Sequence, residues 1–373
     1  MTVDQIYELV NNVAQQTLGA TAIQAVDTAS LVALGDTVLA STNSTENFLN
    51  TLVARIGRTI IAHRKYDNQL APIVMDNMEW GAIVQKIRVL MPTVSEDDAF
   101  ELTDGESIDM YKIKKPKSEQ KLFYKKSAYQ CSVTIQEFQL KEAFLSPTAM
   151  GSFIAAVFGE VKNYLEYAIE NLSRLTMANY MALTGNNQRI DLVTMYNAAT
   201  GNNIDPDLTA LRNPAFLRYA IGQMNMYGKK MKTMSNLYNT EGKTRFTPDS
   251  KQMFAIINEF QTAMETEVQY AAFHDDYVKK RANIEVPYWQ AAKSPFDIKL
   301  NVWDGVAQSK KPVEVKNIVG FLFDRDALGT FRKEEAVLTT PMNARGRYTN
   351  TFWHEQQMWF NDLSENGIIF TLN

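Results

Sequence analysis

Several residue types are scarce in this chain of 373 residues, and each scarcity excludes a class of protein. A single cysteine, Cys131, cannot form an internal disulfide, and it cannot supply a zinc site built from several thiolates. The chain has only three histidines, and they are far apart. The sequence therefore predicts neither a disulfide scaffold nor a cysteine-rich metal domain.

The histidines and the cysteine also lack the neighbours that catalysis or metal binding needs. His354 begins a near match to the zinc-protease helix motif, but Met358 stands where the second histidine ligand belongs. We expect His354 in a strand between aromatic residues, His274 at a solvated helix end and His63 at the surface. We expect Cys131 to be a small buried hydrophobic residue. We predict no catalytic, cofactor-binding or metal-binding residue.

Glycines are never closely spaced, which removes the common nucleotide and hydrolase motifs. The shortest interval between any two of the 17 glycines is the six positions from Gly222 to Gly228. A dinucleotide fingerprint needs glycines about two positions apart, a P-loop about five and a nucleophile elbow about four. None of these motifs can be drawn on this sequence.

Basic residues are absent from the first part of the chain, which reaches Arg55 before the first Lys or Arg. Signal and transit peptides begin with positive charge, so we expect neither. No run approaches the roughly 18 apolar residues of a membrane span, so we expect no membrane association. The formal net charge of −4 gives the chain no global electrostatic reason to coat nucleic acid.

Hydrophobic residues make up 45% of the chain and charged residues 21%, a composition that can bury a sizeable core. Residues 1–50 are rich in Ala, Thr, Asn, Gln, Val and Leu, and we expect them to form no core of their own. Residues 4–18 show weak helical periodicity. We predict that 1–50 is an arm that lies over other surfaces. The alternative is a helical hairpin packed on the chain's own core.

Charge is sorted by sign in the middle of the chain. Seven acidic residues and no basic one occur between Ser95 and Asp109, and seven lysines with one acid follow between Lys112 and Lys126. The acidic and basic blocks can pair within one hairpin or between subunits, and a merely solvated loop is the alternative. Exposed pairs contribute only about 0–1 kcal/mol, so they set register more than stability. The residues that we expect to make intersubunit contacts are Glu96, Asp97, Asp98, Glu101, Lys112, Lys114, Lys115, Lys117 and Lys121.

The clearest element is a long helix predicted over about 147–184. Ser146 suits the N-cap and Pro147 the first helical position, and apolar residues then recur every three or four positions. Glu170 and Arg174 form an i,i+4 pair that we place on the opposite, polar side. Gly185 is expected to end the helix in the left-handed conformation. An earlier break of the helix is the alternative.

The remaining elements alternate between helix and strand before the chain becomes β-rich. We expect loop over 186–212, followed by a helix over 213–234 and a second over about 259–273. The predicted strands are 253–257, 284–286, 298–302, 318–323, 336–340, 348–360 and 367–372. A turn sequence lies at 341–346.

Four segments of this sequence resemble the major capsid proteins of tailed bacteriophages, and those of small short-tailed phages most. Residues 52–57 (Leu-Val-Ala-Arg-Ile-Gly) resemble the segment that enters the capsid hairpin, and 324–329 (Asp-Arg-Asp-Ala-Leu-Gly) a buried strand-to-helix step. Residues 340–348 and 350–354 are similar to the closing hairpin. The resemblance covers about 50–373. The closing-hairpin residues that carry it are Asn343, Arg345, Gly346, Tyr348 and Trp353.

The resemblance implies an α+β, HK97-like capsid fold with an N-terminal arm, an extended β-hairpin loop, a peripheral domain with the long spine helix, and an axial α/β domain. The implied parts are an arm over 1–50, a hairpin loop over 65–128, an axial domain over 205–330, and a peripheral domain over 51–64, 129–204 and 331–373.

The function implied is that of a non-enzymatic major capsid protein, without cofactor, that assembles as hexamers and pentamers into an icosahedral phage head around double-stranded DNA. Its partners would be copies of itself, a separate scaffolding protein and a portal, with non-specific proximity to DNA and no membrane. Its place would be the virion, after assembly in the host bacterial cytoplasm. Two alternatives are an encapsulin-like nanocompartment shell and a soluble enzyme without a recognisable motif.

Overall fold

The computed structural model divides the chain into two compact units, Glu79–Lys125 and a main unit made of Met1–Met78 with Lys126–Asn373. Each unit is described by itself. The structure describes residues 3–19, 22–56, 66–75, 83–90, 102–107, 109, 111, 113, 115–269, 284–304 and 309–373.

The N-terminal region forms three helices: α1 (Val3–Leu18), α2 (Thr28–Leu39) and α3 (Thr42–Ile56). The predicted arm over 1–50 is therefore wrong, and helices on the chain's own core describe this region better. Each short helix contributes one apolar stripe to a core that it shares with later elements, so the segment needs no separate core of its own. Large members of this first core are Leu31, Leu34, Phe48, Phe144, Ile154 and Trp353.

The long helix begins as predicted, with Ser146 as N-cap and Pro147 in the first turn. It consists of α5 (Pro147–Ile154), a π-helical turn η3 (Ala155–Gly159) and α6 (Glu160–Ala182), and is roughly 54 Å long at 1.5 Å per residue. Gly185 does not end it in the left-handed conformation, because its φ is −77°. Thr184 instead closes the last turn by donating its hydroxyl hydrogen bond to the Met181 carbonyl (2.7 Å).

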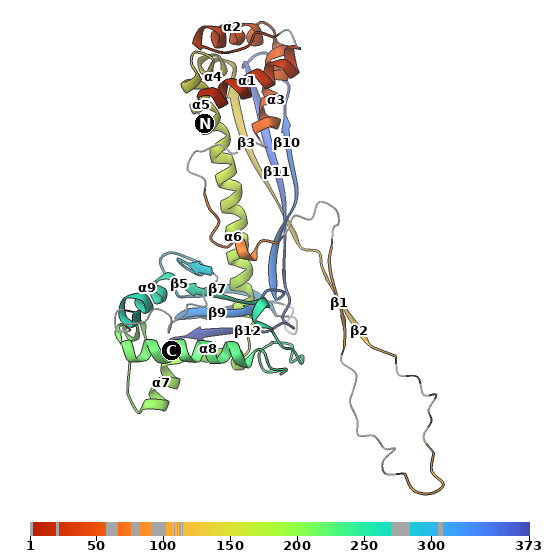
Figure 1. Cartoon of the computed structure of the whole chain (residues 1–373), viewed down its shortest axis with the longest axis vertical. Helices are drawn as coiled ribbons and strands as arrows, with labels where there is room; N and C mark the ends of the chain where they lie inside the picture. The colour runs from red at the N-terminus through yellow and green to blue at the C-terminus, as the bar shows by residue number, and fades with distance from the viewer. Residues whose placement is uncertain are drawn as a thin grey trace. The chain divides into compact units, whose positions relative to one another are not determined.

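A three-stranded antiparallel sheet runs beside this helix (Figure 1). Its order is β10 (Leu328–Thr339), β11 (Tyr348–Asn361) and β3 (Lys126–Gln136), and the short helix α4 (Glu137–Ala143) follows β3. β11 alternates between buried and half-buried residues over most of its length, as expected for a sheet with one face packed on a core. Trp353 of β11 contacts Phe158 of the π turn edge to face, with ring centroids 5.8 Å apart.

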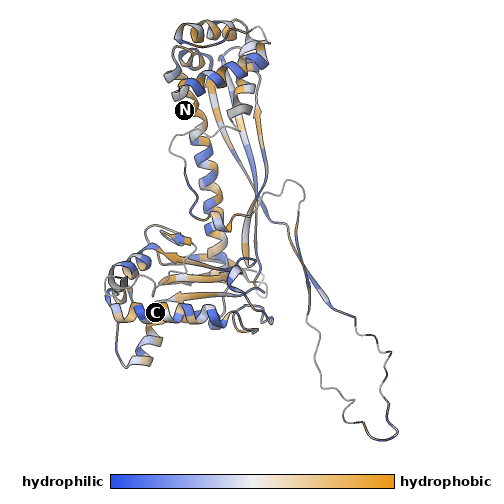
Figure 2. Ribbon diagram, in the orientation of Figure 1, coloured by the Kyte–Doolittle hydropathy of each residue, from blue (hydrophilic) through white to orange (hydrophobic). Residues whose placement is uncertain are grey.

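A five-stranded mixed sheet forms the second core of the main unit, and Figure 2 shows hydrophobic residues along its strands. In spatial order its strands are β4 (Arg189–Asp191), β12 (Gly367–Thr371), β9 (Ile318–Asp324), β5 (Gln252–Ile257) and β6 (Ile284–Val286). Every residue of β9 and β12 is buried, because helices and loops cover both faces of these strands. A separate two-stranded sheet is made of β7 (Ile298–Asp304) and β8 (Ser309–Val315).

The end of α6 packs on the five-stranded sheet, where Gly367 makes the close approach possible. A Cβ at Gly367 would lie 2.5 Å from the Tyr180 ring, so a larger residue would displace that ring. The Tyr180 hydroxyl donates a 2.7 Å hydrogen bond to the Glu365 carbonyl. The pKa of this phenol is raised, mainly by burial. The strand and the helix are thereby fixed to each other.

Three more helices complete this core: α7 (Leu192–Thr200), α8 (Pro214–Lys230) and α9 (Asn258–Ala263), which runs into the π-helical η7 (Met264–Gln269). Asn213 caps α8 as predicted, although α8 ends at Lys230 rather than 234. The expected loop over 186–212 is wrong, because it contains β4 and α7. Asp191 caps α7 by accepting from the Val193 and Thr194 amides. Short 3-10 helices are η1 (Ala71–Ile73), η4 (Asn186–Gln188), η5 (Leu208–Arg212) and η6 (Asp249–Lys251).

The predicted domain boundaries need correction at three places. β4 and β12 lie in the five-stranded sheet with β5 and β9, so the second core reaches outside 205–330 at both ends. Residues 324–329 join strand β9 to strand β10 and do not lead into a helix. Residues 66–75 belong to the main unit, so the separate hairpin unit is 79–125 rather than 65–128.

Candidate functional site

The separate unit 79–125 contains one antiparallel pair, β1 (Val84–Val89) with β2 (Ser118–Phe123). The register runs from Val84 opposite Phe123 to Val89 opposite Ser118, and the Leu90 amide continues it by donating to the Lys117 carbonyl (2.8 Å). A single two-stranded hairpin is at best marginally stable in water. The unit therefore lacks the stabilisation that the two cores give to the main unit.

The two faces of this ribbon differ in character. Ile87 (65% exposed), Val89 (68%) and Leu122 (49%) share one face with Gln85, Ser118 and Gln120. The other face places Arg88 opposite Glu119, Lys86 opposite Lys121 and Val84 opposite Phe123. We call the surface formed by Ile87, Val89 and Leu122 the apolar hairpin face. Exposed apolar residues gathered on one face of a ribbon are typical of a surface that is covered in an assembly.

The structure places only part of the predicted charged contact set. Lys121 lies in β2, and Lys115 and Lys117 are exposed just before it. Glu96, Asp97, Asp98, Glu101, Lys112 and Lys114 lie outside the described residues. The pairing of the acidic block with the lysines therefore stays a prediction.

Residues 66–75 are tied to the long helix by a buried polar cluster. The Tyr66 hydroxyl donates to Glu170 Oε2 (2.7 Å), and Arg174 Nη2 pairs with Glu170 Oε1 at 2.7 Å. Burial, followed by the hydrogen bond to Glu170, raises the pKa of Tyr66 to about 12. The Arg174 guanidinium lies 4.1 Å from the centroid of the Tyr288 ring. This cluster holds in place the chain segment that precedes the hairpin unit.

The predicted i,i+4 pair is thus formed, but its predicted location on an exposed face is wrong. Glu170 is 1% exposed and Arg174 is 4% exposed. The helix from Ile169 to Ala182 is buried on nearly all sides, because the three-stranded sheet, residues 66–75 and the second core surround it. The nearly continuous apolar character of 176–182 was the sequence signal for a helix buried all round.

The closing hairpin between β10 and β11 brings four of its five predicted residues into one tight turn. Asn343 Oδ1 accepts hydrogen bonds from the amides of Arg345 (3.0 Å) and Gly346 (2.9 Å). A Cβ at Gly346 would lie 2.4 Å from the Tyr348 ring, which explains the glycine. Trp353 does not join the turn, because it lies farther along β11 in the first core.

One ion pair and one hydrogen bond clamp this turn to neighbouring helices. Arg347, with a positive φ of 51°, pairs through both Nε and Nη2 with Glu137 of α4. The hydrogen bond from Arg347 lowers the pKa of Glu137. The Met342 amide donates to Glu46 of α3 (2.5 Å). The turn is therefore fixed within the subunit, in contrast to the β1–β2 ribbon.

A polar seam between the sheet and the long helix was missed by sequence reasoning. Glu355 of β11 is 2% exposed, and burial raises its pKa. Arg332 lies between Glu166 of α6 (2.7 Å) and Glu355 (3.7 Å), and Gln357 donates to Glu355. The alternation of side chains along the strand could have revealed this seam, because residues two apart in a strand share a face. An inward Trp353 therefore directs Glu355 and Gln357 inward as well.

The residues considered for catalysis or metal binding do not converge in the described part of the chain. His354 lies in β11 as predicted, stacked on Phe352 with ring centroids 6.3 Å apart, while His63 and His274 are outside the described residues. Cys131 is half-buried, which raises its pKa. No group of three metal-ligating side chains occurs among the described residues. None of their helices is long and apolar enough to cross a membrane.

The chain was compared with curated sequences, with solved structures and with protein-family models. A search of curated protein sequences finds no match. Among solved structures, the capsid structure of Staphylococcus phage Andhra contains a similar chain, with a TM-score of 0.57 and 9% identity over 84% of this chain and 87% of that one. The structure of the head fibre and inner core protein gp22 of native bacteriophage P68 contains another, with a TM-score of 0.54 and 10% identity over the same shares.

Both likenesses are in fold rather than in sequence, and they confirm the expected HK97-like α+β capsid fold. The family model for Phi29-like phage major capsid proteins matches residues 8–371, which is nearly the whole chain. The chain therefore belongs to the Phi29-like phage major capsid protein family.

Proposed function

We propose that this major capsid protein assembles as hexamers and pentamers into a closed icosahedral head that encloses double-stranded phage DNA. As a capsid protein it is a structural component of the virion. The observation that carries the proposal is the match of the family model over residues 8–371. Assembly in the host bacterial cytoplasm, with a separate scaffolding protein and a portal, is part of the proposal.

The hairpin unit 79–125 is the proposed contact with neighbouring subunits. Its support is the combination of an exposed apolar hairpin face with blocks of opposite charge. Charged pairs of about 0–1 kcal/mol each select a register without making errors permanent. Head-to-tail contacts of this kind close into rings when the rotation between subunits is correct. Weak, numerous contacts thus suit a shell that must correct itself during growth.

The charge of the N-terminal helices supports only non-specific proximity to DNA, without tight binding. Asp4, Glu8, Asp27 and Asp36 are exposed on α1 and α2 or at their ends, and no Lys or Arg precedes Arg55. Such a surface repels phosphate, so its proximity to packaged DNA would be non-specific. A salt-sensitive affinity of the free subunit for duplex DNA would contradict this part of the proposal.

The test is expression of the protein alone and then with its neighbouring genes, followed by light scattering and negative-stain microscopy. Closed shells, tubes or rings of five and six subunits are expected. Shells that contain an enzyme cargo instead of DNA would favour an encapsulin-like compartment. A small discrete oligomer under every condition would overturn the proposal and return attention to the enzyme alternative.

A further inference from the structure

One asparagine of this chain is followed directly by glycine, at Asn366–Gly367. Asparagine is a thermolabile residue, and an Asn-Gly pair is especially prone to deamidation, because glycine has no side chain to hinder attack by its own amide nitrogen. Gly367 is the first residue of β12, a strand whose residues are all buried, and Asn366 itself is 0% exposed. The most labile residue pair of the sequence therefore lies in a buried part of the second core.

The glycine of this pair is required by packing. The Tyr180 ring lies 2.5 Å from the place that a Cβ at position 367 would take. The Gly367 amide donates a hydrogen bond to the Tyr238 carbonyl (2.8 Å), and Gln188 Nε2 donates to the Gly367 carbonyl (2.9 Å). The nitrogen that would attack in a deamidation is thus held in a hydrogen bond.

The asparagine is required by hydrogen bonding. Asn366 lies in the connection 362–366 between β11 and β12, which we call the β12 corner. Its Nδ2 donates to Thr247 Oγ1 (3.2 Å), and its Oδ1 accepts from Asn239 Nδ2 (3.4 Å). Its backbone carbonyl accepts from the Asp324 amide (2.9 Å). Three separate segments therefore hold this residue, and none of its contacts survives if the corner opens.

Deamidation needs no group other than the pair itself and water. The Gly367 nitrogen attacks Cγ of Asn366, the Cγ–Nδ2 bond breaks, and ammonia leaves with the proton that the nitrogen carried. The product is a five-membered succinimide ring. Water then opens the ring at either carbonyl and leaves aspartate or isoaspartate at position 366. In the closed corner both reacting groups are engaged elsewhere, so the ring cannot form without opening.

Either product is unsuited to the closed corner. An aspartate at position 366 has no amide hydrogens for Thr247 and adds a negative charge beside buried Asp324, which already accepts from the Thr247 hydroxyl (2.8 Å). Burying a charge without a partner is costly. Isoaspartate inserts one methylene into the main chain just before β12, so it shifts the strand against Tyr180. An opening that leads to deamidation is therefore not reversed.

We propose that Asn366 is a modification site that deamidates only when the β12 corner opens, and that its product then prevents the corner from closing. The site records covalently each subunit whose second core has opened. Its rate is the rate of an unprotected Asn-Gly pair multiplied by the fraction of time that the corner is open. The inference goes beyond the proposed function and applies to the free subunit, so it can be tested without shells.

The first test compares the folded subunit with the subunit denatured in guanidinium chloride, both kept at the same mildly alkaline pH. Peptide mapping by mass spectrometry quantifies aspartate and isoaspartate at each asparagine. In the denatured chain Asn366 should convert before every other asparagine. In the folded subunit it should convert more than about a hundredfold more slowly, because opening a core strand is rare. Equal rates would overturn the protection, and slow conversion in the denatured chain would overturn the site.

A second test opens the corner without changing the labile pair. Thr247→Val removes the partner that Asn366 and Asp324 share. Deamidation of the folded variant and hydrogen exchange at the Gly367 amide should both accelerate about tenfold or more, because both report the same opening. Thr371→Val, at the other end of β12, is the matched control and should change neither rate. Faster exchange at Gly367 without faster deamidation would overturn the inference.

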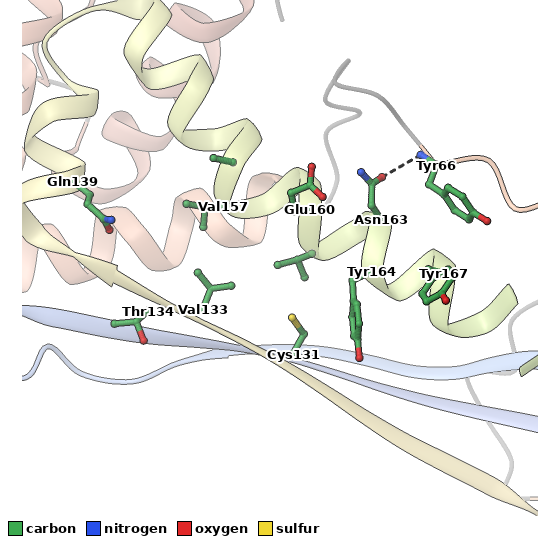
Figure 3. A pocket seen from close by; sticks show the side chains of 12 residues that line it. Tyr66, Cys131, Val133, Thr134, Gln139, Val157, Glu160, Asn163, Tyr164 and Tyr167 are labelled. Carbon is green, nitrogen blue, oxygen red and sulfur yellow. Dashed lines mark hydrogen bonds between the residues drawn. The ribbon is translucent and has the colours of Figure 1, made fainter. Parts of the chain in front are cut away.

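The single cysteine shows whether the rest of the main unit stays folded in this variant. Cys131 and Tyr164 line an open groove of about 850 Å³ between β3 and the long helix (Figure 3). Cys131 packs against the first core, so its reaction with a maleimide reports on that core and not on the β12 corner. Its labelling rate should stay at the parent value in Thr247→Val. Labelling that accelerates together with deamidation would overturn the local character of the opening.

The last measurement tests the consequence of the modification. Asn366→Asp reproduces one product, so its urea midpoint at neutral pH should be lower than that of the parent. The difference should shrink as pH falls, because a protonated carboxyl group can again donate to Thr247 and carries no charge beside Asp324. Superimposable unfolding curves at neutral pH would overturn the claim that the product keeps the corner open.

Discussion

Two of the antiparallel β-ribbons in the described residues, β10–β11 and β1–β2, are held in place by different means. The β10–β11 ribbon buries one face against the long helix, and its turn is clamped by Arg347 to Glu137 and by Glu46 to the Met342 amide. The β1–β2 ribbon forms no part of either core and exposes Ile87 and Val89. The same local structure therefore serves stability in one ribbon and is available for association in the other.

Removing the aromatic anchor of β11 should have the largest effect on the subunit. Trp353→Ala deletes a side chain that is 6% exposed and packs on Phe158. Urea unfolding should show a loss of about 3–5 kcal/mol in the free energy of unfolding. Phe352→Ala, on the more open face of the same strand, is the matched control and should cost less than half as much. Equal losses would show that β11 is not anchored through one face.

Breaking the buried ion pair on the long helix should have the second largest effect on subunit stability. Glu170→Ala leaves the Arg174 guanidinium buried without its carboxylate and removes the acceptor for Tyr66. We expect a loss of about 3 kcal/mol, at the lower end of the range for such changes because Tyr66 is partly exposed. Hydrogen exchange over residues 66–75 should accelerate in this variant. Unchanged exchange there would contradict the role of the cluster in holding this segment.

The buried Glu355 should make the β10–β11 ribbon sensitive to pH. Its pKa is raised above the ordinary value of 4.5, so the folded state holds a proton longer than the unfolded state. Stability therefore falls as pH rises from about 4.5 through the raised pKa. Glu355→Gln should remove this contribution, so that the variant gains stability relative to the parent across that window. Denaturant unfolding at a series of pH values measures it, and parallel curves would contradict the assignment.

The exposed clamp at the turn should contribute little. Arg347 is largely exposed and Glu137 less so, so Arg347→Ala should cost about 0–1 kcal/mol. The pKa of Glu137 is lowered, so this contribution is present at neutral pH and is lost as pH falls through the lowered pKa. Thermal unfolding at a series of pH values should show the difference at pH 7 and its loss as pH falls through the lowered pKa of Glu137. A cost above 2 kcal/mol would make the clamp a main support of the turn.

Reversing charge on the β1–β2 ribbon should have the smallest effect on the subunit and a large effect on assembly. Lys114→Glu with Lys115→Glu and Lys117→Glu should change the free energy of unfolding by less than about 0.5 kcal/mol. Shell assembly at physiological salt should nevertheless be lost. The matched control reverses three exposed lysines of the main unit, Lys293, Lys310 and Lys311, and should assemble normally. Normal shells from the hairpin variant would show that its lysines do not set register.

Local sequence signals predicted the elements of the fold well where residues adjacent in sequence decide the structure. Ser146 and Pro147 start the long helix, Asn213 caps α8, and side-chain periodicity identifies β11. The turn at 341–346 follows from its residues. α7 was missed because its asparagine-rich and glycine-rich flanks read as loop, although Asp191 provides an N-cap.

The candidate site was predictable only in part. The closing-hairpin residues were named from the resemblance to capsid proteins, and four of them lie within six positions of one another in one turn. Tyr66, Glu170 and Tyr288 were not grouped, because their contacts join segments about a hundred residues apart. The groove lined by Cys131 and Tyr164 was not foreseen either, since strand β3 and the long helix both contribute to it.

The sequence by itself determined the α+β character, the long helix, the ribbons and the sorting of charge, because capping, side-chain periodicity and turn chemistry act over a few residues. Only the tertiary structure decided which faces are buried. It brought the N-terminal helices into a core with later elements, placed β4 and β12 in one sheet, and enclosed Glu170 and Glu355. These outcomes depend on contacts between segments that are distant in sequence. The residue pattern of either segment alone does not reveal such a contact.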